Sequence, residues 1–71
     1  MKKKKKYKCV YDGNFGKNIW VTNGSDECMF EIVGIFKRLK LVRTTANKDE
    51  LIILKSKAGE YLKELIKNDL L

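Results

Sequence analysis

The segment from residue 25 to residue 40, SDECMFEIVGIFKRLK, constrains the fold most because it carries the most complete helix signature in the chain. Ser25 is a suitable N-cap, acidic residues follow it directly, and basic residues gather at the far end, which complements a helix dipole. The apolar residues recur at steps of three and four and would form one broad face. They are Cys28, Met29, Ile32, Val33, Ile35, Phe36 and Leu39. This pattern predicts a central helix over residues 25–40, packed on a core.

Two β-hairpins are expected to flank this helix. The first runs from Tyr7 to Thr22, where two strand-like segments enclose the turn-rich stretch DGNFGKN. The second runs from Lys40 to Lys55 with a polar turn at residues 46–49, and the continuous apolar run at residues 51–54 favours a covered central strand. A second helix is predicted to begin near Ser56. Its expected apolar face consists of Ala58, Tyr61, Leu62, Leu65, Ile66 and Leu70.

These elements predict one small α+β domain over residues 7–71, after a basic disordered tail at residues 1–6. The expected order is β-β-α-β-β-α, with two helices on one face of a four-stranded antiparallel sheet, and a winged-helix-like fold is the alternative. The other face of the sheet would be open to water and would expose part of residues 51–54 together with Val10 or Trp20. Small monomers seldom leave such an apolar patch bare, so the pattern also predicts a homodimer.

The positive charge is concentrated at two places in the 71-residue chain. The formal net charge is +7, and six lysines before residue 9 leave a body with ten basic and nine acidic residues. The lysine tail would attract any polyanion without selecting one. A second cluster, with no acid inside it, lies where the predicted central helix joins the next strand, and it indicates a polyanionic partner more strongly. The predicted nucleic-acid-binding residues are Lys2, Lys3, Lys4, Lys5, Lys6, Lys37, Arg38, Lys40 and Arg43.

Aromatic side chains add a second ingredient of nucleic-acid binding, because bases stack on them. Tyr7, Cys9 and Tyr11 share one face of the first strand and are expected to pack under the helices. Phe15 and Trp20 are therefore the predicted exposed stacking pair.

The composition argues against several other classes of function. The chain has no histidine and only two cysteines, which cannot complete a tetrahedral zinc site, so no metal and no cofactor is expected. The paired acids have ordinary places at a helix start and a turn, and Cys28 has no histidine to act as its base, so an enzyme is not expected. Each cysteine lies on an apolar face, so two buried free thiols are predicted, with a disulfide between Cys9 and Cys28 as the alternative. No apolar run is long enough for an export signal or a membrane span, and the expected location is the cytoplasm.

Residues 36–65, FKRLKLVRTTANKDELIILKSKAGEYLKEL, resemble the second half of a winged-helix DNA-binding domain. Leu39, Leu41 and Val42 match the step from recognition helix to strand, residues 46–49 match the wing, and residues 51–54 match the return strand. Ser56, Lys57, Gly59, Tyr61 and Leu62 match the final part. The resemblance implies that the central helix is a recognition helix, with Lys37, Arg38, Lys40 and Arg43 near the DNA groove or its phosphates.

Two functions from different classes follow. The first is a small nucleic-acid-binding protein, of regulatory type, that contacts DNA or RNA through its tail and basic cluster. The alternative is a small protein of the kind found in phages and mobile elements, which binds and inhibits a host protein. Its basic patches would then contact an acidic surface of the host protein.

Overall fold

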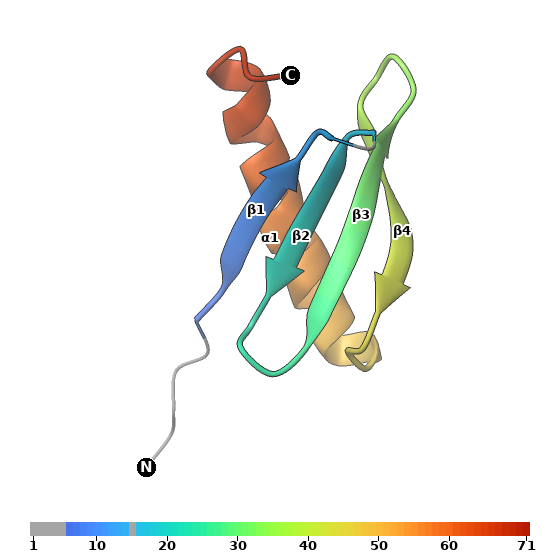
Figure 1. Ribbon diagram of the computed structural model, residues 1–71. Coiled ribbons are helices and arrows are strands. Elements are labelled where there is room, and N and C mark those ends of the chain that lie inside the picture. Colours follow the sequence, from blue (N-terminus) through green and yellow to red (C-terminus); the bar gives the residue numbers. More distant parts are fainter. Residues whose placement is uncertain (1–5, 15) are drawn as a thin grey trace.

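The computed structural model describes residues 6–14 and 16–71, in which four strands form one antiparallel sheet and one helix follows them. The strands are β1 (Lys8–Asp12), β2 (Asn18–Thr22), β3 (Glu27–Val33) and β4 (Arg38–Thr44), and they lie side by side in chain order. Helix α1 (Lys48–Lys67) lies across one face of the sheet (Figure 1). The α+β class and the antiparallel sheet agree with the sequence, whereas the predicted order β-β-α-β-β-α with two helices is wrong, because the order is β-β-β-β-α with one helix.

The predicted central helix at residues 25–40 is replaced by β3, a turn and the start of β4. In β3 the buried residues alternate: Cys28, Phe30 and Ile32 face the core, and the residues between them face away. The dense apolar content of this stretch matches a period of two as well as a period of 3.6, so local sequence did not distinguish them. Gly34 then adopts a φ of +77°, and Lys37 adopts a φ of +52°, which makes the tight turn into β4. Ser25 lies between β2 and β3 and caps no helix.

The predicted second hairpin from Lys40 to Lys55 is also wrong, because its return strand at residues 51–54 is part of α1. Asn47 caps this helix: its side-chain oxygen accepts a hydrogen bond from the backbone N–H of Glu50 at 2.8 Å. The signal Asn-x-x-Glu at residues 47–50 is therefore a helix start where a turn was expected. In a strand, Ile52 and Leu54 would lie on the same face, but in the helix they lie on different faces: Leu54 is fully buried while Ile52 is 69% exposed.

The first hairpin is confirmed, and so is the expected inward face of its first strand. β1 pairs with β2 from Lys8 opposite Thr22 to Asp12 opposite Asn18. Tyr7, Cys9 and Tyr11 pack against the core cluster under α1.

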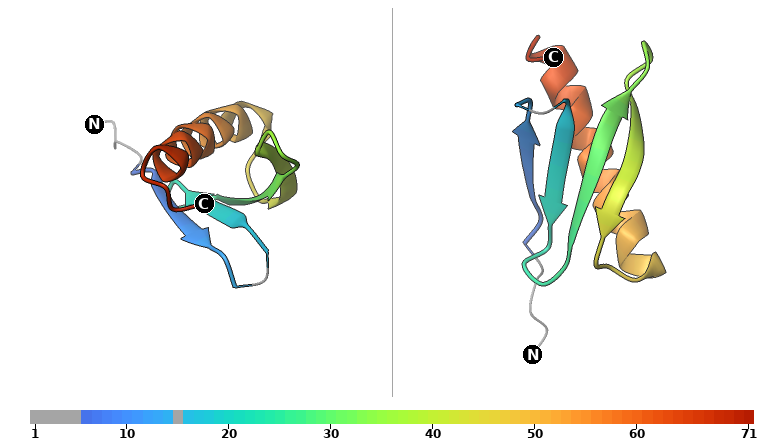
Figure 2. Two further views of the ribbon diagram at one scale, coloured as in Figure 1. Left: turned by 90° about the horizontal axis from the view of Figure 1, so that it is seen from above. Right: turned by 45° about the vertical axis from the view of Figure 1, so that its right-hand side comes forward.

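The core lies between α1 and the inner face of the sheet, and α1 contacts β1, β2 and β3. Seen from above, the helix covers only one side of the strands (Figure 2). The buried apolar core consists of Ile19, Val21, Cys28, Phe30, Ile32, Leu54, Ala58, Leu62 and Leu65. Of the six residues predicted for the apolar face of the second helix, Ala58, Leu62 and Leu65 are buried, whereas Ile66 and Leu70 are exposed.

A buried polar cluster joins three separate parts of the chain beside this core. The carboxyl oxygen Oε2 of Glu50 accepts hydrogen bonds from the Tyr7 hydroxyl at 2.9 Å and from the Asn23 side-chain amide at 2.8 Å. The other side-chain atom of Asn23, Oδ1, accepts from the backbone N–H groups of Ser25 and Asp26. The cluster thus ties the entry to β1 and the β2–β3 turn to the first turn of α1.

No helix in the described part of the chain is long and apolar enough to cross a membrane.

Candidate nucleic-acid interface

The outer face of the sheet, opposite α1, carries a row of four side chains that crosses all four strands. Val10 pairs with Trp20, Trp20 with Met29, and Met29 with Arg43. Residues directly opposite each other in antiparallel strands share a face, and the neighbours of Trp20 in β2, Ile19 and Val21, are buried under the helix. The indole of Trp20 therefore lies on the outer face, where it is half-buried among its neighbours. At strand spacings of about 4.8 Å the row extends roughly 14 Å.

This row, Val10–Trp20–Met29–Arg43, combines apolar and cationic character in a way that suits a base and its phosphate. An indole offers a flat π-surface, the thioether of Met29 is polarizable, and the guanidinium of Arg43 is exposed at the end of the row. Arg43 also has the planar donor geometry that matches phosphate oxygens.

An irregularity in the pairing of β3 with β4 determines which basic residues share the outer face. Phe30 pairs with Leu41 and Met29 pairs with Arg43, so Val42 has no residue opposite it. This β-bulge resets the alternation of β4 and places Lys40 and Arg43, three residues apart, on the same face. Without the bulge Arg43 would lie on the inner face with Leu41.

The predicted basic cluster is therefore divided rather than placed on one helix. Lys40 and Arg43 are exposed on the outer face, and Arg38 is exposed at the start of β4. Lys37 lies in the β3–β4 turn, where its side chain is half-buried and its backbone N–H donates to the carbonyl of Gly34 at 3.2 Å. The helix-end geometry expected for these residues is wrong because β4 occupies that segment.

Carboxylates also lie on the outer face and limit its positive potential. Glu31 pairs with Lys40 across β3 and β4, and Glu27 lies four residues before Glu31 on the same face of β3. Asp12, at the end of β1, pairs with Asn18. The positive end of the face is consequently the β4 side, next to Arg43.

Of the remaining predicted site residues, Lys6 is exposed two residues before the start of β1. Lys2, Lys3, Lys4, Lys5 and Phe15, the stacking partner predicted for Trp20, lie outside the described residues. Met29 is the residue beside Trp20 that sequence reasoning missed. Its pairing could not be found in the sequence while β3 was interpreted as a helix.

The two cysteines occupy the same row of the inner face on β1 and β3. Both Cys9 and Cys28 pair with Val21, from opposite sides of β2, which places them two strand spacings, roughly 9.6 Å, apart. That exceeds the Cα separation that a disulfide spans, and both are free thiols as predicted. Burial, and to a lesser degree the negative charge of Glu60, raises the pKa of the Cys9 thiol, while Lys57 partly opposes the shift. Cys28 is fully buried, with its sulfur 2.9 Å from the Thr44 hydroxyl.

Comparison with protein-family models, with curated proteins and with solved structures gave no match. Nothing in these comparisons bears on the winged-helix resemblance. Residues 25–40, which the resemblance assigned to a recognition helix, contain β3, the β3–β4 turn and the start of β4. Residues 51–54, which it assigned to a return strand, lie in α1.

Proposed function

We propose that this protein binds single-stranded nucleic acid on the outer face of its sheet. The observation that carries the proposal is the placement of Trp20, Met29 and Arg43 next to one another on that face. Stacking of one base on an aromatic side chain contributes about 1–3 kcal/mol and depends little on sequence. An open strand presents unstacked bases to such a surface, whereas a duplex does not.

The basic residues supply the electrostatic part of the interaction. Arg43 and Lys40 at the β4 side position the phosphates, and the lysines of the N-terminal segment add attraction without selectivity. Each neutralised phosphate releases counterions, so the affinity falls as salt rises, with a slope of about −0.7 per contact for single strands. The nearby carboxylates of Glu27 and Glu31 oppose a long phosphate path across the sheet, so the footprint is short.

Fluorescence anisotropy with labelled DNA and RNA of about 12 nucleotides, single-stranded and duplex, at several salt concentrations tests this proposal. Replacing Trp20 with leucine should weaken single-strand binding about tenfold or more and leave the salt slope unchanged. Arg43→Gln should lower that slope by about 0.7, and Lys63→Gln on the exposed side of α1 is the matched control. A flat salt response, absence of binding near micromolar concentration at low salt, or an unaffected Trp20→Leu variant would refute the proposal.

A protein partner is the second candidate, and one observation favours it. Ile35 and Phe36 at the tip of the β3–β4 turn are 86% and 79% exposed, which is unusual for adjacent large apolar residues. A host protein that is bound and inhibited through this tip would cover both side chains. The basic cluster would then lie against an acidic surface of the host protein. A pull-down after nuclease treatment, with Phe36→Asp as the comparison, separates the two functions. A stoichiometric partner that survives nuclease and is lost with Phe36→Asp supports this candidate, and loss of every partner with nuclease opposes it.

A further inference from the structure

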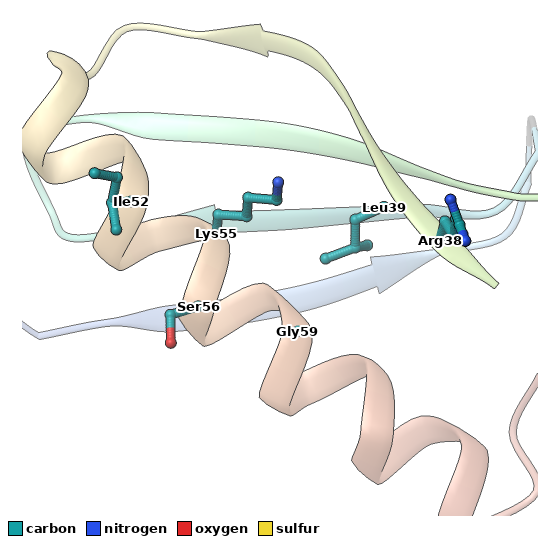
Figure 3. Close-up of a pocket in the computed structure, with 6 residues that line it drawn as sticks. All are labelled: Arg38, Leu39, Ile52, Lys55, Ser56 and Gly59. Atoms are coloured by element: carbon teal, nitrogen blue, oxygen red, sulfur yellow. The ribbon is translucent and has the colours of Figure 1, made fainter. Parts of the chain in front are cut away.

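The inner face of the sheet is only partly covered, and a groove remains between β4 and α1. Helix α1 packs on the first three strands, so the inner side of β4 has no helix directly over it. Figure 3 shows the groove between the strand and the helix. It is lined by Arg38 and Leu39 of β4 and by Ile52, Lys55, Ser56 and Gly59 of α1.

β4 forms one edge of the sheet and borders this groove with its first two residues, Arg38 and Leu39. It pairs with β3 on one side, and no described segment pairs with its other side. An edge strand presents a row of backbone N–H and C=O groups that can accept another strand. An edge strand beside a helix is a geometry in which an extended peptide can add to the sheet and insert alternate side chains between strand and helix.

Gly59 provides a separate indication that the groove accommodates side chains. Glycine inside a helix costs about 1 kcal/mol relative to alanine, yet a Cβ at position 59 would meet no atom within 4 Å. Packing within the chain therefore does not require glycine there. Its effect is to keep the groove wall open opposite Leu39.

The charge of the groove selects the kind of peptide. Arg38 and Lys55 stand on opposite walls, and none of the six lining residues is acidic. β4 also carries Lys40 and Arg43 and no acidic residue. A second copy of β4 would bring like charges together, which is destabilising across a strand pair. Acidic side chains on an added strand would instead meet opposite charge.

We propose that the groove between β4 and α1 binds an extended acidic segment of a partner protein, which adds to the free edge of β4. Its alternate apolar side chains enter the groove beside Leu39, Ile52 and Gly59. Its carboxylates point to the opposite face of the added strand, beside Arg38 and Lys40 of β4. This site is distinct from the outer-face row and does not depend on nucleic-acid binding.

The probe is a labelled peptide of alternating glutamate and valine with seven residues, the length of β4, compared with its lysine–valine counterpart. The acidic peptide should bind the whole protein at least about tenfold more tightly. Two further versions carry N-methyl groups on alternate residues, one on each edge of the peptide. The version methylated on the edge that faces β4 should lose binding and the other should keep it, because only one edge pairs with the sheet. The proposal would be overturned if the glutamate–valine and lysine–valine peptides bound equally well. It would also be overturned if both methylated versions bound as tightly as the unmodified peptide.

Protein variants locate the site. Gly59→Leu places a side chain in the groove without an internal clash, so the fold, checked by thermal unfolding, should persist while peptide affinity falls about tenfold or more. Lys40→Glu should weaken binding, and Lys67→Glu at the exposed end of α1 is the charge-matched control. Trp20→Leu should leave peptide binding unchanged, which separates this site from the outer face. Unaltered peptide binding by Gly59→Leu would refute the assignment of the peptide to this groove. So would the finding that the protein binds no peptide but forms a concentration-dependent dimer that Gly59→Leu abolishes.

Discussion

The hydrogen bonds to Glu50 should contribute a measurable share of the stability of this domain. The carboxyl oxygen of Glu50 accepts from the Tyr7 hydroxyl and the Asn23 amide, and the side chains of Glu50 and Asn23 are only 7% and 5% exposed. A net hydrogen bond contributes about 1 kcal/mol, and a buried donor left without an acceptor costs about 1–3 kcal/mol. Glu50→Ala leaves two donors without an acceptor, so it should lower the free energy of unfolding by about 3 kcal/mol. Tyr7→Phe removes one donor and should lower it by about 1 kcal/mol.

A domain of this size has a small free energy of unfolding, so a substitution that costs less is easier to measure without unfolding the protein. Glu50→Gln retains an oxygen acceptor and should cost about 1 kcal/mol, while Tyr7→Phe combined with Glu50→Ala should cost less than the sum of the single changes by about 1 kcal/mol. Urea unfolding followed by Trp20 fluorescence and circular dichroism measures each free energy. Thr22→Ser, a conservative change outside the Glu50 cluster, serves as the control. Additive costs within about 0.3 kcal/mol for the double variant would show that the Tyr7–Glu50 hydrogen bond has no energetic weight.

Three further predictions address the turn, the thiols and the oligomeric state. Gly34→Ala should destabilise the domain by about 1 kcal/mol in thermal unfolding, because an alanine is strained at a φ of +77°; no atom lies close enough to add a clash. Gly59→Ala, inside α1, should be neutral or stabilising, and a destabilisation by both substitutions would contradict this account. The raised pKa of the Cys9 thiol means that the unfolded chain loses its proton first, so stability should fall as pH rises from the unfolded to the folded pKa, a decrease that Cys9→Ser should lack. Alkylation at pH 8 should accordingly modify Cys9 slowly and the fully buried Cys28 only on unfolding, and rapid labelling of Cys28 would be inconsistent with its burial. If the outer face mediates a homodimer, sedimentation over about a hundredfold concentration range should show association that Trp20→Lys abolishes, whereas a monomer throughout would remove the dimer.

The candidate site shows how far local sequence reasoning extends. The sequence predicts an exposed Trp20 because Tyr7, Cys9 and Tyr11 form the face of the first strand that is expected to pack under the helices, and this alternation is a local signal. Its neighbours in space, Met29 and Arg43, come from strands that pair only in the folded chain. The bulge opposite Met29 has no signature of its own in the sequence, yet it decides that Arg43 lies beside the indole.

The sequence by itself determined the position of the charge, the first hairpin and the C-terminal half of α1. Each depends on residues close together in the chain: the lysine run, the turn residues between β1 and β2, and the apolar spacing of Ala58, Leu62 and Leu65. Only the tertiary structure decided that residues 27–33 form a strand and residues 51–54 a helix. Both stretches are so apolar that they match either period, and the choice comes from what they pack against. β3 is held between β2 and β4, where Cys28, Phe30 and Ile32 are buried under α1, and residues 51–54 continue a helix that Asn47 starts and that Glu50 links to the sheet.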